Sequence, residues 1–221
     1  MAAMPAARPV RHIFRSAAPI AIAVFVFAVS FGVLAVSAHL PGWSVVLMSL
    51  LVFAGSAQFA ALGVITAGGS ILTAVLAGAL LNLRYIATGI AVARSLPGGR
   101  LRRALLGQIV VDESYALAVA AGEPGRPDRR TLLVVGATLY TVWVLGTLTG
   151  TLLGPVLGDP KRLGLDAAFP ALFLALLWPM LSGRHVRCAL GGAAVALLLA
   201  PFTPPGIPLA GAAVVGLWLA R

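Results

Sequence analysis

Charged residues are scarce in this chain. Asp, Glu, Lys and Arg make up 10% of its 221 residues, against about 25% in an average soluble domain, while hydrophobic residues make up 60%. A soluble fold of this length cannot keep so much apolar surface away from water. A bilayer-spanning helix needs about 20 predominantly apolar residues, and uncharged runs of that order occur at 16–83, 131–158 and 188–220. The sequence therefore predicts an all-α, polytopic transmembrane helical bundle.

Residues that build metal centres, disulfides and catalytic sites are also scarce. The single Cys188 excludes an intrachain disulfide and a cysteine-rich metal site. His12, His39 and His185 have no metal-ligand spacing, and the sequence holds neither an HExxH nor a GxSxG motif. We therefore expect no metal, no cofactor and no catalytic residues, and an intramembrane enzyme is a less favoured alternative.

The basic residues far outnumber the acidic ones, 16 Lys and Arg against 6 Asp and Glu. They flank apolar segments instead of forming a stripe with stacking aromatics, which argues against nucleic acid as a partner. Lys and Arg collect in cytoplasmic loops, so these clusters mark one side of the lipid bilayer. We expect a cytoplasmic basic tail at 1–16 and one transmembrane transport domain at 17–221. The chain should be a multi-pass protein of the cytoplasmic or inner cell membrane, with both termini in the cytoplasm. The internal clusters are Arg8, Arg11 and Arg15; Arg94, Arg100, Arg102 and Arg103; Arg126, Arg129 and Arg130; and Arg184 and Arg187.

The number of membrane crossings does not follow simply from these clusters. After a first span at 17–38, two stretches of near-spanning length, 45–67 and 71–93, surround a Gly-Gly break. Two full crossings there would put the Arg94 cluster outside, against the positive-inside rule. The segment 105–122 is similarly ambiguous. Two topologies stay open: about six membrane segments with broken or re-entrant pieces, or about eight with one misplaced basic loop.

The run LVFAGSAQFAA places Gly55, Ser56 and Gln58 within apolar surroundings. Adjacent Gly and Ser loosen a helix, and the free amides at the start of a half-helix can hold a carboxylate. We therefore count Gly55, Ser56 and Gln58 among the predicted substrate-binding residues. Close helix packing, with Gln58 bonded across an interface, is the alternative, and this run taken by itself favours it.

The run LLNLRYIATGI carries Arg84, which is the only ionised residue between 16 and 93. A buried guanidinium costs at least about 2.5–3.5 kcal/mol on insertion scales, so it should face a partner, a cavity or an anionic substrate. Snorkelling of the long side chain to the cytoplasmic face is the alternative. Asn82 and Tyr85 add polar groups beside Arg84, and we interpret the three as substrate-binding.

The run VVDESYALA carries Asp112 and Glu113, two of the six acidic residues in the chain. Adjacent helix positions point about 100° apart, so one acid can pair with Arg84 while the other faces water or a pore. Buried carboxyls suit proton coupling or binding of an ammonium group. An interfacial helix with both acids in water is the alternative.

Taken together, VFAGSAQFAA, LLNLRYI, VVDESYALA and GLDAAFPALFLALLWP resemble, in this order and spacing, the AzlC family of branched-chain amino-acid exporters. The resemblance covers roughly 19–181. It implies a large subunit that works with a small AzlD-type membrane subunit to export branched-chain or other apolar amino acids. On this reading Arg84 and the Gly55 and Ser56 amides hold the substrate carboxylate, and Asp112 or Glu113 holds the ammonium and couples transport to protons. A non-transporting membrane scaffold subunit is the alternative function.

Overall fold

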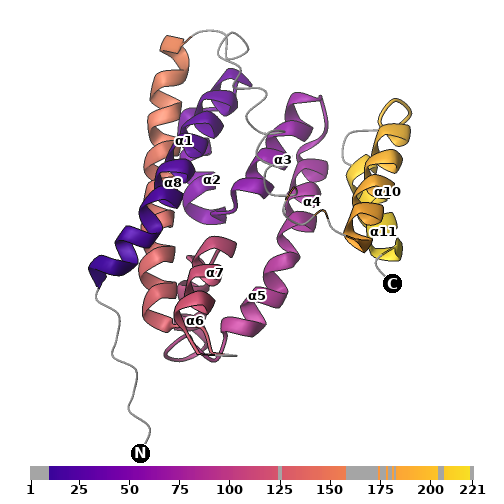
Figure 1. The fold of residues 1–221 in the computed structure, drawn as a ribbon. Helices are drawn as coiled ribbons and strands as arrows, with labels where there is room; N and C mark the ends of the chain where they lie inside the picture. Colours follow the sequence, from indigo (N-terminus) through magenta and orange to yellow (C-terminus); the bar gives the residue numbers. More distant parts are fainter. Residues whose placement is uncertain are drawn as a thin grey trace, which may run out of the picture.

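The described part of the chain is helical throughout. The computed structural model describes residues 10–123, 126–157, 174, 178, 181, 183–203 and 207–219, and within these ranges it has no strand beyond an isolated bridge. The all-α prediction is confirmed for this part (Figure 1). The helices are α1 (Val10–Ser37), α2 (Gly42–Val52), α3 (Gly55–Thr66), α4 (Ile71–Asn82), α5 (Arg84–Val92), α6 (Arg100–Gly107), α7 (Asp112–Ala121), α8 (Arg129–Leu157), α10 (Arg184–Leu199) and α11 (Ile207–Leu219).

The two long helices, α1 and α8, form the frame of the molecule. Their apolar stretches have mean hydropathies of 2.6 and 1.8, and each is long enough to cross a membrane. They run parallel and side by side (Figure 1), because Ala28 of α1 faces Gly146 of α8 and, further along both helices, Val36 faces Gly154. The tail expected at 1–16 is partly helical, since α1 already begins at Val10.

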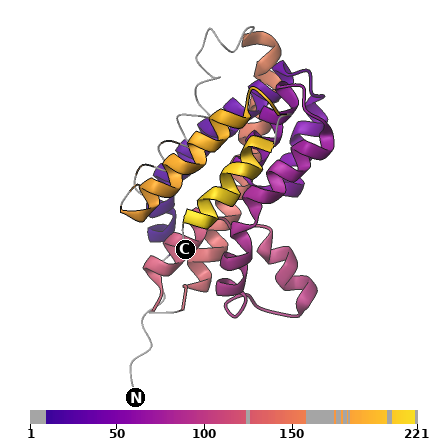
Figure 2. The same cartoon turned by 90° about the vertical axis from the view of Figure 1, so that its right-hand side faces the viewer.

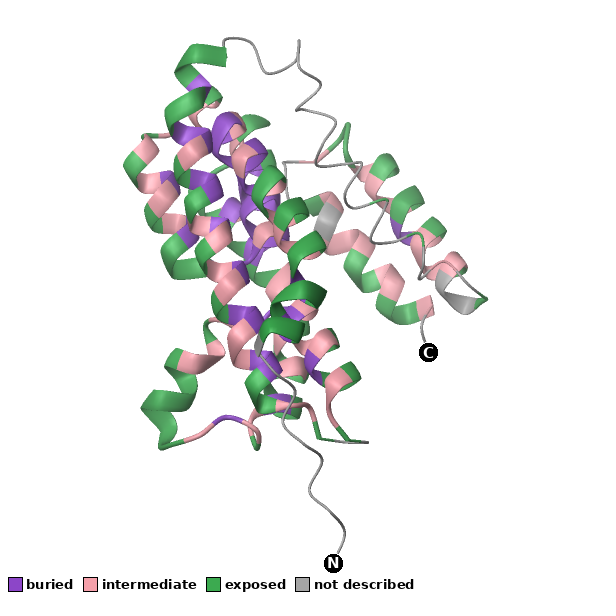
Figure 3. Cartoon of the chain, turned by 60° about the vertical axis from the view of Figure 1, so that its left-hand side comes forward, coloured by how far each residue is buried: buried purple, intermediate pink, exposed green. Residues whose placement is uncertain are grey.

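Glycine sets how closely this long pair packs. A Cβ on Gly150 would lie 2.9 Å from the Cα of Gly32 and would overlap the carbonyl oxygen of Val29. Because these neighbours are backbone atoms, no side-chain rotation would relieve the clash. Phe31 of α1 packs on Phe59 of α3 and on Trp143 of α8, so the core lies where this pair meets α3. Figure 3 shows the buried residues gathered in the interior of the bundle.

The α2–α3 pair enters the bundle and leaves it at the same end, the shape that we call re-entrant. The start of α2 lies near the end of α8, where Gly42 approaches Thr151, and its last turn reaches the middle of α8, where the Tyr140 hydroxyl donates to the Leu50 carbonyl over 2.8 Å. From there α3 leads back (Figure 1) and packs antiparallel against α4. The near-spanning stretch 45–67 is therefore a broken element.

A strained residue ends α2. Phe53 is buried and has φ of 38°, a left-handed conformation that is uncommon outside glycine. Edge-to-face packing on the Tyr140 ring, 5.1 Å between centroids, holds it in place. The break exposes two carbonyls of α2, and both accept hydrogen bonds from side chains. The Tyr140 hydroxyl donates to the Leu50 carbonyl, and Gln108 Nε2 donates to the Leu51 carbonyl over 2.6 Å.

The α4–α5 pair runs the other way, past the middle of α8 toward its start. It bends by 44° between Asn82 and Arg84. At its far end Val92 and Leu96 pack with Leu132, near the beginning of α8. The hairpin of α10 and α11 lies on the outer side of α4 (Figure 2).

The α6–α7 pair is also re-entrant, from the opposite end of the bundle. It bends by 106°. Arg103 of α6 lies near Leu96, and the end of α7 at Ala121 shares a small cavity with His12 and Thr131, which belong to the starts of α1 and α8. Both outer ends of the pair therefore lie at the end of the bundle where α1 and α8 begin.

The breaks in these pairs agree with the broken or re-entrant pieces that the sequence predicted, and the Arg94, Arg100 and Arg126 clusters lie at one end of the molecule. The described residues hold two helices long enough to cross a membrane, or up to four if each bent pair counts as one span. The expected count of six to eight is not confirmed. Most of the run GLDAAFPALFLALLWP, at 164–179, lies outside the described residues.

Candidate functional site

Arg84 lies where three interrupted helix pairs meet. It is the first residue of α5, directly after the bend. Its Nη2 donates to the Ser56 hydroxyl over 2.8 Å, and its Nη1 lies 3.0 Å from Oδ2 of Asp112. Ser56 is the second residue of α3 and Asp112 the first of α7, so one guanidinium joins the starts of both half-helices. The predicted pairing of Arg84 with one of the two acids is confirmed, and the acid is Asp112.

Tyr85 completes this cluster, which we call the Arg84 junction (Ser56, Arg84, Tyr85 and Asp112). The Arg84 guanidinium lies 5.0 Å from the centroid of the Tyr85 ring, and Nη2 is 3.4 Å from its hydroxyl. The Arg84 and Asp112 side chains are each 45% exposed. Lipid chains cannot solvate an ion pair, so in a membrane this opening has to face water, a solute or another polypeptide. The inward contacts of Arg84 argue against snorkelling.

The start of α3 adds backbone donors beside Arg84. No side chain caps this helix, and its first hydrogen bond back to the chain runs from Gln58 N to the Ala54 carbonyl. The N–H groups of Gly55 and Ser56 therefore point out of the helix start, where the helix dipole is positive. A Cβ on Gly55 would lie 2.7 Å from the Trp143 ring, so only glycine fits at this approach.

The other predicted site residues lie close by in sequence without joining these contacts. Glu113 is half-buried on α7, and within the described ranges no ion pair links it to Arg84. Asn82 ends α4, and its Oδ1 is buried without a hydrogen-bond partner among the described residues. No group of three or more His, Cys, Asp or Glu side chains suited to a metal ion occurs in that part of the chain.

Gln58 lies in a separate, buried network. Its Nε2 donates to Ser49 over 2.9 Å, and its Oε1 accepts from Trp143 Nε1 over 2.9 Å. Ser49 in turn shares a hydrogen bond of 2.9 Å with Thr147. The network ties α3 to α2 and α8, which gives Gln58 a positioning role, while its contact with substrate stays a prediction. Isolated polar residues such as Ser49 and Thr147 give no distinct signal in an apolar helical sequence.

Comparisons with known proteins agree on one family. The family model described as AzlC protein matches residues 19–157. An uncharacterized membrane protein of Archaeoglobus fulgidus is 35% identical over 90% of this chain and 88% of its own length. The branched-chain amino acid transport protein AzlC of Bacillus subtilis is 27% identical over 84% of this chain and 76% of its own length. The inner membrane protein YgaZ of Escherichia coli is 28% identical over 87% of this chain and 80% of its own length.

No solved structure matches. The family match runs from the middle of α1 to the end of α8 and so includes all four residues of the Arg84 junction. The resemblance that the sequence motifs indicated is confirmed: this chain belongs to the AzlC family of membrane transport proteins.

Proposed function

We propose that this chain is the large subunit of an exporter for branched-chain or other apolar amino acids. The observation that carries the proposal is the half-exposed Arg84–Asp112 ion pair where three helix interruptions meet. A zwitterion within a bilayer needs donors for its carboxylate and an acceptor for its ammonium, and the junction offers both. The printed name of the Bacillus subtilis relative supports the substrate class.

The ion pair suggests how substrate binds. The substrate carboxylate takes the place of Asp112 on the Arg84 guanidinium, beside the amides of Gly55 and Ser56. Its ammonium then binds the released Asp112 carboxylate, or binds Glu113 if Asp112 takes up a proton. One internal pair of opposite charges becomes two, so no charge is left unpaired in the low-dielectric interior. Release of substrate restores the Arg84–Asp112 contact.

Proton coupling is assigned to Asp112 or Glu113, the two carboxyls in the first turn of α7. A protonated carboxyl is neutral and moves past apolar surroundings at a lower free-energy cost than a carboxylate. Asp112 is paired with Arg84 in the empty site, so there a proton on Glu113 lowers the cost of returning the site across the membrane.

The two re-entrant pairs suggest how the transport path crosses the membrane. The end that carries Arg94, Arg100 and Arg126 is assigned to the cytoplasm, and both chain termini are proposed to lie on that side of the inner membrane. The α6–α7 pair then enters from the cytoplasm and the α2–α3 pair from outside, with the junction between them. A small AzlD-type membrane subunit is proposed to cover part of the half-exposed junction.

The function is tested by loading cells with radiolabelled leucine or valine and following efflux. Cells express this chain, the small subunit, both or neither. We expect efflux only with both chains and its loss with an uncoupler. An Arg84→Ala, Glu113→Gln double variant at equal membrane abundance should abolish it, and unchanged efflux from that variant would refute the site. The scaffold alternative expects these side chains apart, so the 3.0 Å contact of Arg84 with Asp112 favours transport.

A further inference from the structure

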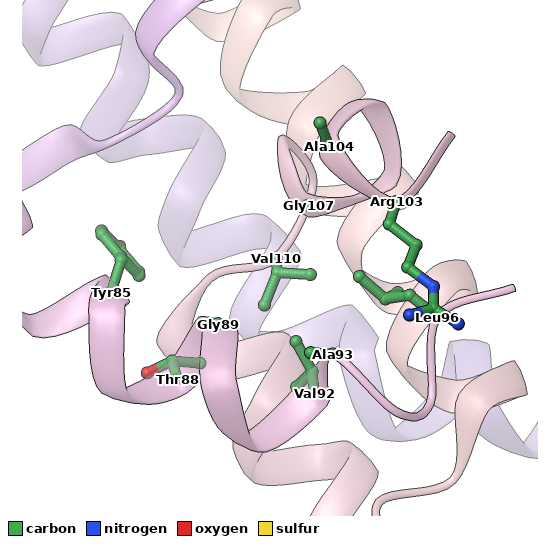
Figure 4. Close-up of a pocket in the computed structure, with 10 residues that line it drawn as sticks. All are labelled: Tyr85, Thr88, Gly89, Val92, Ala93, Leu96, Arg103, Ala104, Gly107 and Val110. Carbon is green, nitrogen blue, oxygen red and sulfur yellow. The ribbon is translucent and has the colours of Figure 1, made fainter. Parts of the chain in front are cut away.

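A cavity of about 260 Å³ lies between α5 and α6, next to the Arg84 junction (Figure 4). One face of α5 lines it, at positions 85, 88, 89 and 92, and the turn that follows this helix adds positions 93 and 96. Gly89 stands in the middle of that face. Ile86 and Ile90 lie on another face of α5 and are exposed. Gly89 and Gly107 therefore give the cavity its width, because neither has a side chain to fill it.

The two ends of the cavity differ in chemistry. Tyr85 stands at one end and Arg103 with Leu96 at the other (Figure 4). Between them the lining is apolar apart from the Thr88 hydroxyl, and it contains no carboxylate. The Tyr85 ring also lies 5.0 Å from the Arg84 guanidinium, so the cavity adjoins the predicted binding site for the substrate carboxylate.

We propose that this cavity receives the apolar side chain of the transported amino acid while Arg84 binds its carboxylate. The inference rests on the proposed function and makes Gly89 a residue that determines which substrates are accepted. The volume is below the roughly 300–1,000 Å³ of sites for drug-sized ligands, which suits a single amino-acid side chain. An apolar lining without a carboxylate disfavours lysine and other cationic side chains.

The first test narrows the cavity with Gly89→Leu. Gly63 on α3 supplies the matched control, because both glycines are exposed, both lie inside helices, and a Cβ at either position would have no neighbouring heavy atom within 4 Å. We expect Gly89→Leu to lower kcat/KM for leucine and isoleucine about tenfold relative to alanine. Gly63→Leu should leave that ratio at the wild-type value.

The second test measures occupancy without transport. A Thr88→Cys variant in a Cys188→Ala background should react with a small water-soluble thiol reagent, and leucine should slow the reaction while lysine should not. If wild type exports leucine, and neither the substrate ratio of Gly89→Leu nor the reactivity of Thr88→Cys changes as expected, the cavity does not hold the side chain and the inference is wrong. If wild type exports no amino acid, the proposed function fails, and the inference fails with it.

Discussion

The long pair α1–α8 and the Arg84 junction are built on opposite principles. The long pair is continuous, and its glycines bring the two backbones into contact. The junction consists of interruptions: α2–α3 breaks at Phe53, α4–α5 bends before Arg84, and α6–α7 turns by 106° before Asp112. A continuous helix satisfies its own amides, so backbone groups are free to bind a ligand only where a helix is broken.

The two regions are joined by the buried network of Gln58. It fixes the first turn of α3 to Trp143 and, through Ser49, to Thr147 of α8. A binding site made of loose helix ends needs such support to keep its geometry. Stability and binding should therefore respond to different residues, which the following variants test.

The largest effect is expected from Gly150→Leu in the long pair. The new side chain would overlap the backbone of Val29 and Gly32, so α1 and α8 would have to move apart. Overpacking costs about 1–3 kcal/mol, and more where backbone is the obstacle. We expect little folded protein by size-exclusion chromatography in detergent. Gly63→Leu, which meets no neighbour, should elute as wild type does, and normal folding of Gly150→Leu would contradict the close packing.

Arg84→Ala should have the second largest effect. It should lower the rate of transport and leave folding unchanged. Removing one partner of a hydrogen-bonded charge pair costs about 2–5 kcal/mol, and the half-exposure of this pair places it near the lower end. We expect leucine efflux to fall by about 30-fold at equal membrane abundance. Arg84→Lys should give an intermediate rate, because an ammonium cannot hold Ser56 and Asp112 in the fork geometry of a guanidinium. Full transport activity of Arg84→Ala would show that the Arg84 junction has no role in transport.

Gln58→Leu should reverse this pattern and affect stability more than substrate binding. It leaves Trp143 Nε1 without its acceptor, a buried loss of about 1–3 kcal/mol. The expected result is a lower Tm in detergent with an unchanged KM for leucine in reconstituted vesicles. An unchanged Tm with a raised KM would instead assign Gln58 to substrate binding, as the sequence alone suggested.

Ser56→Ala should have the smallest effect. It removes one hydrogen bond to a charged group that keeps its contact with Asp112. We expect a loss of about 1 kcal/mol, equivalent to roughly a fivefold higher KM for leucine, with Tm unchanged. A lower Tm at unchanged KM would show that Ser56 contributes to stability, as the long pair does, and not to substrate binding.

The sequence predicted much of the junction because its residues are anomalous in their surroundings. Arg84, Asp112 and Glu113 are ionised groups in apolar segments, which indicates partners or a cavity. The adjacent Gly55 and Ser56 indicated a broken helix, and the break lies at the preceding residues Phe53 and Ala54. The basic clusters left broken or re-entrant pieces as one of two solutions, and the structure contains bent and broken helix pairs, while the number of crossings stays a prediction.

The supporting contacts could not be read from the sequence. Tyr140 and Gln108 bond to the carbonyls of Leu50 and Leu51 from 90 and 57 residues away. Nothing local to Tyr140 or Trp143 distinguishes a side chain that bonds across the fold from one at an interface. The length of a run such as 45–67 also predicts a crossing as readily as a pair that turns back.

We infer that the re-entrant pairs α2–α3 and α6–α7 enter from opposite faces of the membrane and meet at Arg84. Thiol labelling is the direct test of this claim. In a Cys188→Ala background, Trp43→Cys reports the start of α2, Ala67→Cys the end of α3, and Gly99→Cys the loop before α6; all three positions are exposed. An impermeant reagent should label the first two on intact cells and the third only after permeabilisation. Labelling of positions 43 and 67 from opposite sides would make α2–α3 a full crossing and would contradict the claim.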